Sequence, residues 1–193
     1  MRICVFAASS DHLEKRYLEA AEALGELLGQ GGHTLIFGGG QTGLMGACAR
    51  GAARTGAEIV GVAPRFFDEP GVLYEHCGRM IWTDSMAERK TRMEEEAEAF
   101  LILPGGIGTM EEFFEVLTQA QLGLHAKPMA LLNTAGYYDD LAAFLRRMAE
   151  TGFAGCEVPA LAKRCDSPEE ALRALTEAAK REARGCSKTD YFN

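Results

Sequence analysis

The sequence predicts an α/β fold, an open parallel sheet of about seven strands with helices on both faces. Short apolar runs of strand length recur along the chain, and segments with helical spacing of apolar residues separate them. The apolar runs lack polar alternation, which is typical of strands buried on both faces of a parallel sheet. Ligands bind such sheets beyond the carboxyl ends of the strands, so the loops that follow the strands are the candidate functional segments.

Seven segments are expected to be strands, because each is a short apolar run between glycine, proline or polar residues. In chain order they span residues 3–9, 34–40, 57–64, 79–84, 99–104, 127–133 and 158–162. The last of these has the weakest pattern.

The segments between the strands are expected to be helices. Residues 13–32 have apolar side chains at helical spacing from Leu13 to Leu28, and Gly31 and Gly32 end that helix. No linker or repeat divides the chain, which predicts a single domain over residues 1–193 with a frayed tail at 183–193. The other helices are expected up to about residue 54, over 85–98, after Pro104, over 136–153 and over 167–183.

The composition is that of an acidic globular protein. Hydrophobic residues make up 47% and charged residues 25% of the 193 positions, and the net charge is −8. This charge disfavours nucleic acid and anionic membranes as partners, and no apolar run approaches the roughly 18 residues of a transmembrane helix. The six cysteines lack metal-ligand spacing and the amino terminus lacks a signal pattern, which predicts no metal site and a reducing, cytoplasmic compartment.

A first glycine loop, "GGGQTGLMG", contains G-x-G-x-x-G at Gly38, Gly40 and Gly43. An NAD-dependent enzyme is the weaker interpretation, because the motif follows the second strand and the acid about 20 residues on, Glu58, begins a strand. Two interpretations remain open. The loop is a tight turn that packs its helix close to the sheet, or it wraps the sugar-phosphate of a mononucleotide through Gly39, Gly40 and Gly43.

A second glycine loop, "PGGIGTMEE", follows the fifth strand and begins a helix. Its three glycines allow close backbone approach, and free N–H groups at a helix start bind phosphate. Thr109 adds a hydroxyl, whereas Glu111 and Glu112 place negative charge beside the expected anion. The G-x-x-x-x-G-K-[ST] spacing of a P-loop is absent, which argues against Mg-nucleotide hydrolysis.

A basic segment, "DSMAERKTRMEEE", precedes the fifth strand. Ser85 and Glu88 have the spacing of a capping box, which places Arg89 and Lys90 in the first turns of a helix. That helix begins at the carboxyl edge of the sheet, so both cations are expected on the same rim as the second glycine loop. Arg92 is instead expected to pair with the following glutamates on a solvated face.

With these motifs, and with "QLGLHAKPMALLN" and "GYYDDL", the chain resembles the LOG (Lonely Guy) family of cytokinin riboside 5′-monophosphate phosphoribohydrolases, often mislabelled lysine decarboxylases. The resemblance covers about residues 3–153. It implies a nucleotide-binding Rossmann-like domain that forms a homodimer or a higher homo-oligomer. The implied reaction hydrolyses the N-glycosidic bond of a purine nucleoside 5′-monophosphate and releases free base and ribose 5-phosphate, without metal or organic cofactor.

The resemblance also implies site residues. The catalytic pair would be Arg89 and Glu112. The substrate-binding residues would be Glu69, Lys90, Gly105, Gly106, Ile107, Gly108, Thr109, Glu111 and Thr118. A carboxylate near the anomeric carbon can stabilise the positive charge of an oxocarbenium-like ribose or take a proton from the attacking water. A nucleotide carrier without turnover is the alternative, but the Glu112 charge would only weaken phosphate binding in such a protein.

Several positions depart from the family pattern. Ala8 and Asp11 stand where the family has glycines, Ala87 replaces a histidine and Gln119 a tryptophan. These changes surround the catalytic signature, so they leave the preferred base open between a prenylated adenine, adenine itself and another purine. The apolar side chains of residues 113–122 are expected to pack in the core first and in a dimer interface second.

Overall fold

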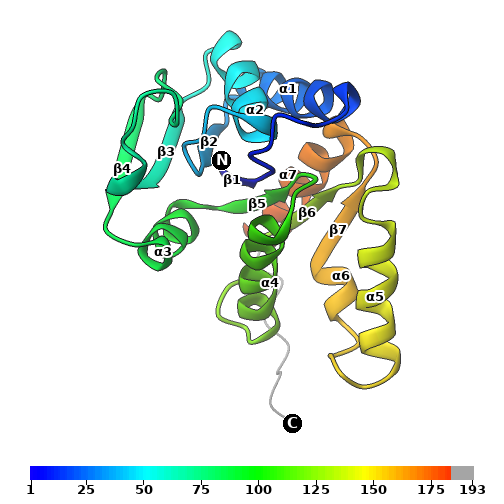
Figure 1. Cartoon of the computed structure of the whole chain (residues 1–193). Helices are drawn as coiled ribbons and strands as arrows, with labels where there is room; N and C mark the ends of the chain where they lie inside the picture. Colours follow the sequence, from blue (N-terminus) through cyan, green and yellow to red (C-terminus); the bar gives the residue numbers. More distant parts are fainter. Residues whose placement is uncertain (184–193) are drawn as a thin grey trace.

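The computed structural model describes residues 1–183, whose seven strands form one parallel sheet (Figure 1). The strand order is β4-β3-β2-β1-β5-β6-β7, and all neighbouring strands are parallel, which confirms the predicted fold class. Except for its first residue, the expected tail at 183–193 lies outside the described residues. The strands are β1 (Arg2–Phe6), β2 (Thr34–Phe37), β3 (Ile59–Pro64), β4 (Arg79–Thr83), β5 (Ala99–Ile102), β6 (Met129–Leu132) and β7 (Ala162–Cys165).

Helices cover both faces of this sheet. Successive strand residues point to opposite faces, so Ile3 and Val5 pack against α1, α2 and α7, while Cys4 and Phe6 pack against α3, α4, α5 and α6. Within residues 1–183, none of the helices has the length and apolar composition needed to cross a membrane. The helices are α1 (Lys15–Gln30), α2 (Gly43–Arg54), α3 (Met86–Glu96), α4 (Ile107–Gln121), α5 (Asp139–Glu150), α6 (Val158–Leu161) and α7 (Pro168–Ala183), with 3-10 turns η1 (Arg65–Phe67) and η2 (Thr134–Gly136).

Helices α1 and α2 pack closely side by side because glycines form their contact (Figure 1). A Cβ atom on Gly25 would lie 2.0 Å from the Cys48 carbonyl oxygen, and one on Gly51 would lie 2.1 Å from the Glu22 carbonyl oxygen. Glycine weakens a helix interior by about 1 kcal/mol relative to alanine. The close approach of the two backbones explains why glycine is nevertheless used at both positions.

The prediction of the seventh strand over residues 158–162 is wrong. Residues Val158–Leu161 form the short helix α6, with a proline in its first turn, and β7 begins only at Ala162. The reason is that β7 lies at the edge of the sheet and pairs only with β6. Its two central residues, Lys163 and Arg164, are exposed, so it lacks the continuous apolar run of the buried strands.

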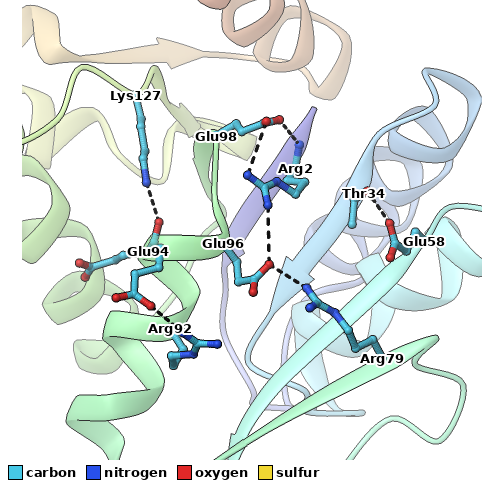
Figure 2. A network of polar contacts seen from close by, with 10 residues as sticks. Arg2, Thr34, Glu58, Arg79, Arg92, Glu94, Glu96, Glu98 and Lys127 are labelled. Atoms are coloured by element: carbon cyan, nitrogen blue, oxygen red, sulfur yellow. Dashed lines mark hydrogen bonds and ion pairs between the residues drawn. The ribbon is translucent and has the colours of Figure 1, made fainter.

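The amino edge of the sheet carries a network of paired charges (Figure 2). The Glu96 carboxylate lies 2.7 Å from the Arg79 guanidinium and 3.8 Å from that of Arg2. The Thr34 hydroxyl donates to Glu58 over 3.0 Å. Glu58 therefore lies at the edge opposite the strand carboxyl ends, where it cannot act as the ribose-binding acid of a dinucleotide site. The expected surface pairing of Arg92 is confirmed, since its guanidinium lies 2.8 Å from Glu95.

Candidate active site

A cavity of about 580 Å³ opens at the carboxyl edge of the sheet, where the loops after β1, β2 and β5 meet. Such a point, where the connections leave neighbouring strands in opposite directions, is the usual ligand site of an open α/β sheet. Apolar side chains form a large part of one wall. The lining residues are Ala7, Ala8, Ser9, Ser10, Gly38, Gly40, Thr42, Met45, Phe67, Val72, Leu73, Met86, Arg89, Gly106, Ile107, Gly108, Thr109 and Glu112.

The first turn of α4 presents backbone N–H groups to this cavity. The first intrahelical bond runs from the Met110 N–H to the Gly106 carbonyl, so the N–H groups of residues 107–109 have no partner within the helix. No side chain caps this helix at Gly106. Thr109 is buried, and a Cβ atom on Gly105 would lie 2.2 Å from its hydroxyl oxygen, so glycine is required at 105. This turn can bind an anion such as phosphate.

Helix α3 begins at the same rim because its amino end is capped as the sequence predicts. The Ser85 hydroxyl accepts from the Glu88 N–H over 3.1 Å. The Glu88 carboxylate accepts from the Asp84 N–H over 2.8 Å, one residue before the position of a regular capping box. The cap places Arg89 in the first turns, with its side chain on the cavity wall.

Arg89 and Glu112 form a buried ion pair on the cavity wall. Their side chains are 9% and 12% exposed, and Nη1 of Arg89 lies 2.8 Å from Oε1 of Glu112. Nε of Arg89 donates to the Val62 carbonyl over 3.2 Å. A Cβ atom on Gly38 would lie 1.9 Å from Nη2 of Arg89, so the first glycine of the G-x-G-x-x-G pattern makes room for the guanidinium.

Local structure also explains why the last position of that pattern is glycine. Gly43 has a φ of +59°, and a Cβ atom there would lie 2.6 Å from the Ala8 carbonyl oxygen. The pattern is therefore explained by close packing of the β1 and β2 loops and of Arg89, without a dinucleotide.

The environment shifts the pKa of Glu112. Burial raises this pKa above its usual value, and the opposing Arg89 charge limits the rise. A carboxylate with a raised pKa is a better proton acceptor than an exposed glutamate. In residues 1–183 no three His, Cys, Asp or Glu side chains converge as ligands for a metal ion.

Comparison with known proteins identifies the family of this chain. The family described as "Possible lysine decarboxylase" matches residues 45–175. The cytokinin riboside 5′-monophosphate phosphoribohydrolase LOG1 of Arabidopsis thaliana is 36% identical over 190 residues, which cover 98% of this chain and 89% of LOG1. LOG7 of the same plant is 41% identical over 152 residues, covering 79% of this chain and 70% of LOG7. The chain belongs to the LOG family. The resemblance found in the sequence motifs is thus confirmed.

Other relatives mark the limits of the match. A probable LOG-family phosphoribohydrolase of Oryza sativa subsp. japonica, LOGL5, is 43% identical, but the match spans only 62% of its length and 79% of this chain. Among solved structures, the molybdenum cofactor carrier protein of Chlamydomonas reinhardtii aligns with a TM-score of 0.73 at 20% identity, over 93% of this chain and 98% of the carrier. That similarity shows the shared fold alone.

The structure does not place all the residues that the LOG family suggested on the cavity wall. Arg89, Glu112, Gly40 and residues 106–109 line the cavity, and Gly39, Gly43 and Gly105 support the loops behind it. The side chains of the remaining candidates do not line it: Glu69, Lys90, Glu111 and Thr118. Ser9 and Ser10 also line it and were not predicted. The first strand was expected to extend to residue 9, whereas β1 ends at Phe6, so both serines belong to the loop at the carboxyl edge.

Lys90 instead connects α3 to α4. Its ammonium lies 2.6 Å from Glu111 and 2.8 Å from Glu115, and these hydrogen bonds raise the pKa of Lys90. Two adjacent residues of α3, Arg89 and Lys90, therefore hold three carboxylates of α4. This arrangement fixes the helix that carries Glu112 relative to the helix that carries Arg89.

Two of the residues that depart from the LOG pattern make side-chain hydrogen bonds. Asp11, at a family glycine, accepts from the Gly43 N–H over 2.8 Å and so caps α2. Gln119 donates to Glu94 over 2.7 Å, between α4 and α3. The amino end of α2 is thus already occupied by a carboxylate of the same chain, while the amino end of α4 has no side-chain cap.

Proposed function

We propose that this chain hydrolyses the N-glycosidic bond of a purine nucleoside 5′-monophosphate and releases free base and ribose 5-phosphate. The observation that supports it best is the buried Arg89–Glu112 pair, one helical turn beyond an uncapped helix start on the same cavity wall. The names of the LOG relatives state this activity for those proteins.

The uncapped turn of α4 would hold the 5′-phosphate. The N–H groups of residues 107–109 and the Thr109 hydroxyl supply donors, and the helix dipole favours an anion there. Glu112 follows Thr109 by three residues, about 4.5 Å along the helix axis. A phosphate bound at the helix start would therefore position the sugar against the Glu112 carboxylate, so that binding energy is used for orientation.

Glu112 would act at the anomeric carbon. When the C–N bond breaks, its electron pair leaves with the base and the ribose develops positive charge, which the carboxylate stabilises. Water then bonds to the anomeric carbon, and its proton passes to the carboxylate or to the departing base. Arg89 holds Glu112 in place and can orient the sugar or assist departure of the base.

The base would lie against the apolar part of the wall, formed by Met45, Phe67, Leu73 and Met86. These side chains suit an uncharged purine and accept an apolar substituent on it. They do not select between adenine and a prenylated adenine. The preferred base is thus the first quantity to measure.

The decisive experiment is incubation of the protein with a panel of nucleoside 5′-monophosphates, including AMP and its N6-prenylated form, with detection of free base. Release of a base together with ribose 5-phosphate is the expected result. Binding of monophosphates, measured by calorimetry, without any base release would instead support the carrier alternative. Binding of NAD, measured in the same way, would support the dinucleotide alternative, against which the packing of Gly38 and the position of Glu58 both argue.

The compartment and the oligomeric state belong to the same proposal. The five cysteines among residues 1–183 are all free thiols, which suits a reducing, cytoplasmic compartment. Exposed apolar side chains at Leu122, Leu124, Phe144 and Phe153 suit a homodimer or a larger homo-oligomer. Light scattering after size exclusion measures the mass, and a monomer at micromolar concentration would contradict the oligomer.

A further inference from the structure

Two adjacent tyrosines, in the segment between β6 and α5, donate hydrogen bonds to the chain between β5 and α4. The Tyr137 hydroxyl donates to the Gly105 carbonyl over 2.7 Å, and the Tyr138 hydroxyl donates to the Leu103 carbonyl over 2.5 Å. The carbonyl between them, that of Pro104, accepts from the Ala8 N–H over 3.2 Å. Three consecutive carbonyls that lead into α4 are therefore held by groups from outside the loop.

The bond from Tyr137 has a consequence for the peptide that follows. Because a peptide unit is planar and trans, fixing the Gly105 carbonyl fixes the Gly106 N–H on the opposite side of the same unit. Gly106 lines the cavity and precedes the N–H groups proposed to bind phosphate. Glycine has little conformational preference of its own, so a loop with three glycines needs such an external restraint to keep its donors aligned.

The segment that carries the two tyrosines is itself tightly constrained. Ala135, in η2, has a φ of +56°, a left-handed conformation that is uncommon for a residue other than glycine. Asn133 is buried, and its side chain accepts from the Tyr138 N–H over 2.8 Å and donates to Asp139 and Asp166. A turn with an uncommon backbone conformation is thus held in place by hydrogen bonds of a buried asparagine, and this turn sets the position of the two phenols.

The two tyrosines differ in burial. Tyr138 is 1% exposed, and burial raises the pKa of its hydroxyl, which stays a donor. Tyr137 is 45% exposed, so core packing does not account for its position. Its ring contacts those of Tyr17 and Tyr138 edge-on, with centroid distances of 6.0 and 5.0 Å, and its hydroxyl is bonded to the loop.

We propose that Tyr137 is a positioning residue for the substrate phosphate: its hydroxyl orients the Gly105–Gly106 peptide so that the donors at the start of α4 face the cavity. Tyr138 fixes the end of β5 beneath that peptide. This inference rests on the proposed function, because it assigns the phosphate to the start of α4. The proposal assigns the "GYYDDL" motif a role in the site, although neither of its tyrosines lines the cavity.

The test uses the full chain and Tyr137→Phe, which removes only the hydroxyl. Loss of one hydrogen bond of about 1 kcal/mol corresponds to roughly fivefold. We therefore expect Tyr137→Phe to weaken ribose 5-phosphate binding, measured by calorimetry, by about fivefold, and to raise KM for AMP by a similar factor with kcat within about twofold. The affinity for adenosine, which lacks the phosphate, is measured in the same way and is expected to be unchanged.

Tyr17→Phe is the matched control, because it removes a hydroxyl from the ring that packs on Tyr137, and this hydroxyl makes no hydrogen bond to the loop. It should match the wild type in both measurements. Wild-type affinity of Tyr137→Phe for ribose 5-phosphate would overturn the inference, as would an equal loss of affinity for ribose 5-phosphate and for adenosine. Failure of the proposed function would show differently, as absence of base release by the wild-type chain.

Discussion

The guanidinium of Arg89 lies over the bare backbone of Gly38, at a place where a Cβ atom would come within 1.9 Å of Nη2. Gly38 directly follows β2 and Arg89 lies in the first turns of α3, so the contact joins the loop after β2 to α3 on the cavity wall. The third partner is Glu112, whose carboxylate accepts a hydrogen bond from Nη1 of the same guanidinium. The position of the proposed catalytic carboxylate therefore depends on the absence of a side chain at residue 38.

Gly38→Ala is expected to displace Arg89 and with it Glu112. A misplacement of about 1 Å can reduce turnover by about 100-fold, and we expect a fall in kcat of that order for release of base from AMP. Gly78→Ala is the matched control, because its Cβ atom would meet its nearest neighbour, the Ile59 carbonyl oxygen, at an ordinary 3.6 Å. A Gly38→Ala variant with wild-type kcat would show that the guanidinium position is not critical.

Glu112→Gln keeps the shape of the side chain and removes its charge. Without the carboxylate, the developing charge on the ribose is not stabilised and the water loses its proton acceptor, so kcat should fall by about 1,000-fold. Ribose 5-phosphate affinity should stay within about threefold, because the phosphate donors belong to the start of α4. Glu95→Gln, on the exposed Arg92 pair, should behave as the wild type. Normal turnover of Glu112→Gln would remove this residue from the mechanism.

The buried strands could be predicted from sequence because burial on both faces leaves a continuous apolar run, as in β5 with its four buried residues. The edge strand β7 could not, since Lys163 and Arg164 interrupt that run and only pairing with β6 makes the segment a strand. Local pattern records burial, whereas β7 is exposed at its two central residues and is defined by its pairing with β6.

The same distinction holds for the site. Arg89 and Glu112 could be proposed from motifs, since each stands at a helix start beside a strand end. The need for glycine at position 38 could not be predicted, because it comes from contact with the side chain of Arg89, 51 positions further along the chain. Tyr137 was equally hidden, since its bond to Gly105 spans 32 positions. Residues carried over by resemblance alone, such as Thr118, stay predictions because their side chains do not line the cavity.

The pH dependence should report the environment of Glu112. Its pKa is raised by burial, so the acid limb of kcat/KM is expected above the ordinary glutamate value of about 4.3. Activity is lost as pH falls through the pKa of the folded protein, because protonation removes the carboxylate charge. Glu111 raises this pKa and Arg89 lowers it. Glu111→Gln should therefore move the acid limb to lower pH, and Arg89→Met should raise the pKa of Glu112.

The carboxylate ¹³C chemical shift of Glu112 measures the same titration without turnover, which suits Arg89→Met. Thermal unfolding of each variant shows whether it is folded. If neither substitution changes the pKa of the acid limb of kcat/KM, that limb arises from a titrating group other than Glu112.

Lys90→Met separates two roles for the second cation of "ERKTRM". The structure pairs Lys90 with Glu111 and Glu115, which suggests that it fixes α3 against α4. In that role its loss should lower kcat for AMP by about tenfold, leave the affinity for ribose 5-phosphate within about threefold, and lower the free energy of unfolding by about 1 kcal/mol. If Lys90 instead binds the phosphate, the affinity for ribose 5-phosphate should fall and KM for AMP should rise, with kcat unchanged. Arg92→Met, two residues on and paired with Glu95 on the solvated face, is the matched control and should leave turnover and affinity unchanged.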